Sequence, residues 1–490
     1  MRSSSHRRDP TRAVAIRSLA IGLAAAFPAA CAPALHAPQP QLALPSTLET
    51  DENAPTRDGF DLVRWWDAFG DPQLAQLAGT ALERSTTIRI ALARLEQARA
   101  TRALSRAGTL PSGSLTGAAT ESGSERAWGR GLTAPDNDSY AANFAPSWEL
   151  DLFGRLSAIR QRADIDRAAA SYDFYGVRLA LIADVATALY QARATSIDLE
   201  IACSARDLTA ALARNADVAV ARGLSSGQDQ ARLHADAASS AAEVLRLEGE
   251  LHAARRSLLI LVGTPDARTD SIVIEPRLLM PPDLPAVTPG IVLTRRPDVL
   301  SAELAVRSAV LGAKIDRLAL FPRFGIQGGA GLTATGGPAA GATGLWSLAA
   351  NLTLPVLDRP RLMAQFRLSE ARGSEAAVRY EKAVQTAYGE AENALVRLRA
   401  GRTRSTQLET AEEQAHRAYD IAARSYRSGL TDLTTLLQTQ RTWLQARSSA
   451  NQGRLAVLTG AVAAIRALGG GWSAEPQQPS STPKSDGTQP

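Results

Sequence analysis

The chain has 490 residues, 45% of them hydrophobic and only 5% aromatic, so it could bury one or two ordinary cores, and its many Ala residues suit closely packed helices. The formal net charge is +5, but residues 1–30 hold five Arg and one Asp and so account for +4 of it. The rest of the chain is nearly neutral, which gives no electrostatic support to nucleic-acid binding.

The first 30 residues have the pattern of an export signal. Several Arg precede a short apolar run over residues 18–27, and small residues follow up to Cys31. Ala29-Ala30-Cys31 is similar to a bacterial lipobox, although Pro28 stands where Leu is usual. We therefore predict a lipoprotein signal peptide over residues 1–30 and a covalent lipid, palmitate included, on Cys31. The alternative is ordinary signal cleavage nearby with Cys31 unmodified.

A Pro- and Ala-rich stretch over residues 31–60 is typical of a tether, here a lipidated one. A helical section opens at Trp65-Trp66 and Asp71-Pro72, with Pro72 near a first turn, and runs to residue 107. After Cys31 the sequence contains only Cys203, so no internal disulfide is expected.

The hydrophobic period then changes from 3.6 to 2. Apolar residues such as Tyr140, Phe144 and Trp148 alternate with polar or small ones, which predicts a strand with one apolar and one polar face. The pattern recurs from Trp346 to Val356. Each of these strands follows a Gly-rich turn and a weaker strand. We therefore predict two hairpins, at about 110–153 and about 322–357.

Each hairpin leads into a very long helical segment. No Pro occurs between Pro146 and Pro265 or between Pro360 and Pro476, and apolar residues there follow a 3,4 spacing. Turns around Gly223 and Gly429 should send a second helix back, so helices are expected over about 155–262 and about 359–468. A continuous outward helix would be about 90–100 Å long at 1.5 Å per residue.

The two halves of the chain are similar at a shift of 205 residues over six seam positions. We therefore predict a first structural repeat over 61–270, a second over 271–472, and a disordered Pro/Ser/Gln/Thr-rich tail over 473–490.

The expected fold class is an α+β membrane protein. Four strands cannot close a barrel and an open apolar sheet has unpaired edges, whereas three chains would supply twelve strands. We predict a twelve-stranded trimeric membrane β-barrel, continued by the long antiparallel coiled-coil helices. The alternative for the strands is a soluble β-sandwich.

Signals for catalysis are weak. The five His residues lack metal-ligand spacing, and HExxH, CxxC and GxSxG motifs do not occur. The GxGxxA letters of residues 329–334 lead into Gly336-Gly337-Pro338 and not into a helix, so a hairpin loop is favoured over a dinucleotide site. We predict no enzyme activity, no catalytic residue, no metal, and no cofactor besides the lipid on Cys31.

Two carboxylates stand out on the polar strand face. The alternation places Glu149 and Asp151 together, where three copies would form acidic rings around a lumen and favour cations. The alternative is a solubilising pair at the barrel rim. Asp432 follows the Gly429 turn, and a helix cap is its simple structural role.

Several blocks of the chain resemble the TolC-type outer-membrane efflux proteins, in particular the lipoprotein branch that serves resistance-nodulation-division pumps. The resemblance spans Trp65 to Trp472. It is carried by Trp65-Trp66 with Phe69-Gly70-Asp71-Pro72, by Trp148-Glu149-Leu150-Asp151-Leu152-Phe153-Gly154-Arg155, by Arg295-Arg296-Pro297-Asp298 with Ala302-Glu303 and Phe321-Pro322, and by Ala467-Leu468-Gly469-Gly470-Gly471-Trp472.

The resemblance implies a homotrimer with a twelve-stranded outer-membrane β-barrel and a periplasmic α-barrel formed by the long helices. It further implies that this trimer docks a periplasmic adaptor protein and an inner-membrane pump. It also implies a pore constriction at the periplasmic tip, which falls on Asp432, Gln438 and Arg441 in this sequence. Arg441 matches the family, whereas Gln438 stands where Asp is common. The expected location is the outer membrane, with outer-membrane lipid around the barrel and a helical extension into the periplasm.

The function expected is a passive exit duct of a tripartite efflux system that conducts small toxic compounds or drugs to the exterior. One rival is a type I secretion duct for polypeptides, which shares the architecture. Another is a periplasmic coiled-coil scaffold without a barrel.

Overall fold

The computed structural model describes residues 33–35, 41, 62–123, 137–284, 294–336 and 340–472. The expected signal peptide, Cys31, nearly all of the tether and the tail from residue 473 lie outside the described residues. Described helices and strands follow the order η2 (Trp65–Phe69), α2 (Pro72–Arg84), α3 (Thr86–Ala107), β1 (Ser112–Ser122), β2 (Asn137–Leu150), α4 (Arg155–Ala221), α5 (Gly227–Val262), η3 (Thr269–Ser271), α7 (Pro297–Leu318), β3 (Arg323–Thr335), β4 (Gly341–Thr353), α8 (Arg359–Arg427) and α9 (Leu433–Ala467). The two hairpins and the long helices that follow them are confirmed.

The chain divides into two compact units. The strand unit contains Leu95–Ala170 and Ser301–Glu381, and the helix unit contains Leu42–Arg94, Ser171–Leu300 and Lys382–Pro490, as far as these ranges are described. Each unit draws on both sequence repeats. The boundaries of the two compact units therefore do not coincide with the boundaries of the two sequence repeats.

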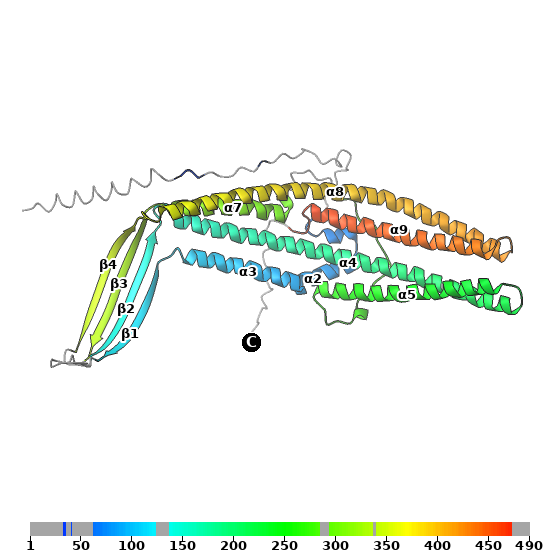
Figure 1. The fold of residues 1–490 in the computed structure, drawn as a ribbon, viewed down its shortest axis with the longest axis horizontal. Helices are drawn as coiled ribbons and strands as arrows, with labels where there is room; N and C mark the ends of the chain where they lie inside the picture. Colours follow the sequence, from blue (N-terminus) through cyan, green and yellow to red (C-terminus); the bar gives the residue numbers. More distant parts are fainter. Residues whose placement is uncertain are drawn as a thin grey trace, which may run out of the picture. The chain divides into compact units, whose positions relative to one another are not determined.

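In the strand unit, four antiparallel strands lie side by side in the order β1-β2-β3-β4 (Figure 1). β1 pairs with β2 and β3 pairs with β4, as hairpins do, while the central pairing joins β2 to β3 across the two repeats. Among the described residues no strand pairs with the outer edge of β1 or of β4. Such open edges favour pairing with further strands.

One face of this sheet is apolar across its width. The register aligns Leu115 with Phe144, Phe144 with Ala330, and Ala330 with Trp346. The side chains at the ends of this row are uncovered in the single chain, since Leu115 is 75% exposed and Trp346 is 85% exposed. A row of large exposed apolar side chains is typical of a surface that is buried against lipid or a partner.

The opposite face is polar and leaves little room on β3. Asn143 on β2 lies opposite Gly331, and Asn351 on β4 lies opposite Gly325. A Cβ atom at Gly325 would come within 2.6 Å of the Asn351 Oδ1 atom, and one at Gly331 would overlap Asn143 in the same way. Glycine at these two positions therefore leaves room for the Asn side chains, which would have to move if a Cβ atom were added.

The long helices form two hairpins, α4 with α5 and α8 with α9. α4 has 67 residues and α8 has 69, as the proline-free segments predicted. The turns use Gly223 and Gly429, whose φ angles of 72° and 71° are left-handed values that favour glycine. Ser226 and Asp432 then cap the returning helices by accepting a hydrogen bond from the backbone N–H three residues later. Among the described residues, no helix is both long and apolar enough to cross a bilayer.

The main hydrophobic core lies in the helix unit, where η2 and α2 pack on α4, α5 and α9. Trp65 is fully buried beside Phe69, whose ring stacks on Tyr190 of α4 with 6.0 Å between centroids. Asp71, the cap of α2, pairs with Arg193 at 2.5 Å, and the two side chains are 2% and 4% exposed. Because an unpaired charge at this depth is costly, the ion pair fixes the start of α2 on α4.

Candidate functional site

Three of the sequence blocks that carry the family resemblance meet in the helix unit. Trp472 donates from Nε1 to the Arg295 carbonyl at 2.9 Å, and the Gly471 N–H donates to the Leu62 carbonyl at 2.5 Å. Gly469 has a φ of 74°, and a Cβ atom there would come within 2.6 Å of the Arg295 carbonyl oxygen. The blocks around residues 65, 295 and 470 are therefore packing motifs that hold one junction together.

Arg296 is the charged centre of that junction. Its guanidinium contacts the carboxylates of Asp298 and Glu390, each at 2.7 Å, and donates to the Ala467 carbonyl at 3.4 Å. Burial alone would lower the pKa of Arg296, but the hydrogen bonds with Asp298 and Glu390 raise it overall. The charged guanidinium thus joins the start of α7, α8 and the end of α9.

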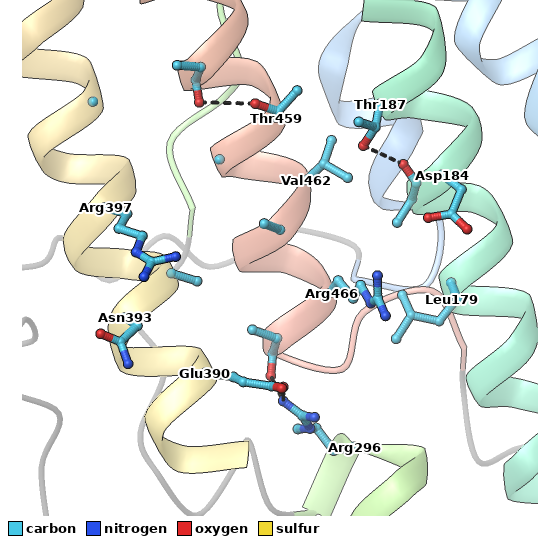
Figure 2. A pocket seen from close by; sticks show the side chains of 18 of the residues that line it. Leu179, Asp184, Thr187, Arg296, Glu390, Asn393, Arg397, Thr459, Val462 and Arg466 are labelled. Carbon is cyan, nitrogen blue, oxygen red and sulfur yellow. Dashed lines mark hydrogen bonds and ion pairs between the residues drawn. The ribbon is translucent and has the colours of Figure 1, made fainter. Parts of the chain in front are cut away.

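Beside Arg296 a cleft of about 1190 Å³ opens between α4, α8 and α9. Figure 2 shows Asp184 on α4, Arg397 on α8 and Arg466 of α9 around it. Partial burial raises the pKa of Asp184, and the nearby Arg466 opposes that rise. No group of three potential metal ligands occurs among the described residues. The cleft is therefore lined by charged side chains of both signs.

The two predicted lumen carboxylates lie in the strand unit, at the start of α4. Glu149 accepts hydrogen bonds from Arg155 at 3.1 and 2.6 Å. Asp151 comes just after β2 and accepts from the backbone N–H groups of Leu156 at 2.9 Å and Ser157 at 2.7 Å. The Arg155 guanidinium thus largely neutralises the charge of Glu149, and the N-terminus of α4 stabilises the charge of Asp151. Their position facing a lumen stays a prediction.

Two more sequence blocks meet in the strand unit, near the start of α4. The Phe153 ring lies 5.2 Å from that of Phe321 and 6.4 Å from that of Phe324, measured between centroids. Gly154, with a φ of 82°, makes the turn into α4. Aromatic packing and a glycine turn therefore connect the two repeats where strands give way to helices.

The residues predicted to form a constriction lie near the start of α9. Asp432 accepts a hydrogen bond from the Thr435 N–H at 2.7 Å. It therefore caps α9, which is the structural role that the sequence suggested. Gln438 is exposed. Arg441 forms an ion pair with Asp236 of α5. The structure brings Arg441 to α5, and a constriction made by these residues stays a prediction.

Sequence reasoning missed Asp236 as the partner of Arg441. A signal was present, because the two positions are separated by the 205 residues that relate the repeats. A second contact between the same helices is the hydrogen bond from Arg232 to Thr434 at 3.3 Å. α5 and α9 are thus tied side chain to side chain near their first turns.

Sequence reasoning also missed a buried polar contact between α4 and α9. Asp198 accepts hydrogen bonds from Asn451 at 3.0 Å and from Ser448 at 3.3 Å, and Asn451 also donates to the Ala194 carbonyl at 2.9 Å. Asn451 is 2% exposed. Burial raises the pKa of Asp198, although these hydrogen bonds and the charge of Arg246 oppose the rise.

The chain is similar to known proteins over most of its length. The family model described as "Outer membrane efflux protein" matches residues 77–264 and 288–471. The chain is 32% identical over 429 residues to "Pyoverdine export outer membrane protein OpmQ" of Pseudomonas aeruginosa, which covers 86% of this chain and 90% of that protein. It is 24% identical over 451 residues to "Probable outer membrane lipoprotein SilC" of Salmonella typhimurium, covering 89% of this chain and 94% of that protein.

Among solved structures, the chain is similar to the one titled "Structural insights of the outer-membrane channel OprN". The TM-score is 0.78 at 28% sequence identity, and the match covers 90% of this chain and 100% of that one. Sequence and fold therefore agree over nearly the same residues.

Proposed function

Since the chain belongs to the outer membrane efflux protein family and is an outer-membrane efflux channel and not an enzyme, we propose that three copies of it assemble into the exit duct of a tripartite pump. In this assembly the chain is a passive path. An inner-membrane pump supplies the energy, and a periplasmic adaptor protein joins the pump to the helical end of the duct.

The observation that best supports a trimer is that both outer edges of the sheet, those of β1 and β4, are unpaired among the described residues. One face of the sheet is also largely apolar. If β1 of each copy pairs with β4 of the next, three copies close a ring of twelve strands and remove every edge. The apolar face then meets lipid and the polar face surrounds water.

A lipid on Cys31 would anchor each copy to the outer membrane. The proposal is supported by the lipobox-like Ala29-Ala30-Cys31 and by the name of SilC, a probable outer membrane lipoprotein. One acyl chain alone gives weak membrane binding, so a lipid would assist an anchor whose main part is the barrel.

The helical end of the duct would narrow at Asp432, Gln438 and Arg441. The ion pair of Arg441 with Asp236 supports a closed state in which α9 is held against α5. Gln438 has no charge to offer a neighbouring copy, so the lock would depend on the Arg441 pair. Glu149 and Asp151 would lie on the water side of the strand ends.

The substrates proposed are small toxic compounds or drugs. OpmQ is named for pyoverdine export, which supports the export of organic solutes. Because a wide water-filled lumen makes few specific contacts, we expect low selectivity among such solutes.

Two neighbouring substitutions on β4 test the trimer. Leu348 lies on the apolar face and Ser347 on the polar face, and both are exposed in the single chain. Lys at a lipid-facing position costs about 2–4 kcal/mol near the bilayer midplane. Leu348→Lys should abolish the heat-modifiable trimer in outer-membrane fractions, and Ser347→Lys should leave it intact. Equal behaviour of the two variants would contradict a lipid-facing sheet.

Export is tested in a deletion strain that expresses each variant. Loss of the protein should raise accumulation of dyes, detergents, aromatic acids or antibiotics, and wild type and Ser347→Lys should reverse this. Unchanged accumulation of every compound, with loss of a secreted polypeptide, would instead favour the type I secretion duct.

A further inference from the structure

The cleft between α4, α8 and α9 carries more positive charge than its own acids neutralise. Arg296 is matched by Asp298 and Glu390. The other charged residues that line the cleft are Asp184 of α4, Arg397 and Arg404 of α8, and Arg466 of α9. The three arginines outnumber the one carboxylate, so the cleft has an excess of positive charge.

These three guanidiniums are available to a ligand. Among the described residues, Arg397, Arg404 and Arg466 form no hydrogen bond or ion pair through their side chains, and all three are exposed. Arg466 interacts with Asp184 only through the electrostatic attraction of their charges, without direct contact. The contrast with Arg296 is clear, because that guanidinium is buried and fully engaged.

The backbone between the arginines leaves room for a bound molecule. The cleft measures about 1190 Å³, and small residues such as Gly401, Gly460 and Ala463 line it alongside the charges. A cavity of this size is somewhat larger than the roughly 300–1,000 Å³ of sites that bury a drug-sized molecule, so such a molecule would fit. Guanidinium groups recognise carboxylates, phosphates and sulfonates through paired hydrogen bonds.

The cleft opens away from the covered side of the helices. Ile182 and Val185 of α4 pack in the core with η2 and α2, whereas Asp184 and Thr187, two residues further along, line the cleft. A step of two residues turns a side chain by about 200° on an α-helix. The layer formed by η2 and α2 and the cleft therefore lie on different faces of α4, with Ala183 at the boundary between them. In the proposed trimeric tube, the layer formed by η2 and α2 must lie on the outside, because the inside has to stay open. The cleft then faces the lumen.

We propose that this cleft is a binding site for organic anions that pass through the duct, solutes bearing carboxylate, sulfonate or phosphate groups. The inference rests on the proposed trimer, and it names the class of substrate that the duct accepts best. In three copies, nine guanidiniums would line the inner wall of the duct.

Dye binding to the purified detergent-solubilised trimer tests the site. Fluorescence anisotropy would compare carboxyfluorescein, an anion, with rhodamine 6G, a cation of similar ring system. The triple variant Arg397→Gln, Arg404→Gln, Arg466→Gln should weaken carboxyfluorescein binding by about tenfold, as expected for the loss of three exposed charge contacts. Replacing all three by Lys should retain most of the affinity, because the charge is kept.

Arg89→Gln is the matched control, since Arg89 is an exposed arginine of α3 outside the cleft. It should bind both dyes like wild type. The inference is overturned if the Gln triple variant binds carboxyfluorescein as tightly as wild type, or if rhodamine 6G binds wild type equally well.

Bilayer conductance separates this inference from the proposed function. Under a KCl gradient, the Gln triple variant should still form channels, with a reversal potential shifted toward cation selectivity. An unshifted reversal potential in conducting channels would overturn the anion site alone. The absence of any conductance in wild type would overturn the duct itself.

Discussion

Arg441 and Asp236 form an ion pair between two positions that the internal duplication makes equivalent. They are 205 residues apart, and one lies on the returning helix of each repeat, α9 and α5. Arg441 is 59% exposed and Asp236 is 20% exposed, so the pair is partly shielded from water. Equivalent helices thus face one another through complementary charges where the family resemblance predicts a constriction.

Breaking this pair should open the duct. Arg441→Ala and Asp236→Asn should each raise single-channel conductance in planar bilayers, and the double variant should add little to either, because both remove one interaction. The expected coupling is about 0.2–1 kcal/mol, as for other partly exposed ion pairs. Arg417→Ala, which removes an exposed pair with Glu413 on α8, is the control. If neither single variant changes the conductance, the pair does not form part of the constriction.

Two aspartates should respond to pH in opposite directions. Burial raises the pKa of Asp198 above its ordinary 3.8, so its stabilising contribution is greatest below 3.8 and is lost as pH rises through the raised value. Hydrogen bonds from Arg102 and Arg106 lower the pKa of Asp164, so its contribution is present above 3.8 and is lost as pH falls through the lowered value.

At pH 7, Asp198→Asn should therefore stabilise the protein, since the amide keeps an oxygen acceptor for Asn451 and Ser448. Asp164→Asn should destabilise it at the same pH. The measurement is the midpoint of urea unfolding in detergent between pH 4 and pH 8, followed by circular dichroism. A shift of the same sign for both variants at pH 7 would contradict the assignment.

The cap at the start of α4 should contribute measurably to stability. Asp151→Ala leaves two backbone N–H groups without their acceptor and should lower the free energy of unfolding by about 1 kcal/mol. Urea unfolding of the trimer in detergent would measure it. Glu121→Gln, on exposed β1, is the control and should leave the midpoint unchanged. A wild-type midpoint for Asp151→Ala would show that the cap is dispensable.

The buried pair between Asp71 and Arg193 should be far more sensitive than any surface pair. Asp71→Asn leaves the Arg193 guanidinium buried without a counter-charge, which costs about 3–5 kcal/mol in comparable cases. Limited proteolysis near η2 should become much faster. The comparison is Glu96→Gln, which breaks an exposed pair with Arg99 and should have almost no effect.

Lipidation can be tested directly at Cys31. Cys31→Ser should abolish incorporation of labelled palmitate, because the serine hydroxyl cannot take the thioether-linked lipid. The barrel should still reach the outer membrane if it is the main anchor. Labelling that persists in the variant would refute lipidation at this residue, and Cys203→Ser serves as the control with labelling retained.

The fold was largely readable from local signals. Proline-free segments and a 3,4 spacing predicted helices that the structure begins at Arg155 and Arg359, and period 2 predicted the strands. Glycine marked both helical turns, since Gly223 and Gly429 adopt left-handed backbone angles. These features depend on a few neighbouring residues, and a single sequence displays them.

The site residues were harder to read because their partners are distant. Period 2 assigned Asp151 to a strand face, yet β2 ends at Leu150 and Asp151 caps α4 instead. Nothing local to Asp198 or Asn451 announces a contact across 253 residues. The unpaired arginines of the cleft were equally hidden, since lacking a partner is a property of the folded chain.

The pairing of β2 with β3 has a consequence for how the ring would be built. Because one polypeptide carries both hairpins, their association is intramolecular and benefits from a high effective concentration. Separate half-length chains would have to form all six joints between hairpins to complete the same ring, with many partial rings on the way. Because each chain carries two hairpins, three of the six joints form within single chains, as β2–β3 pairs, before the chains associate. Only the pairing of β1 with β4 of a neighbouring copy remains to be made.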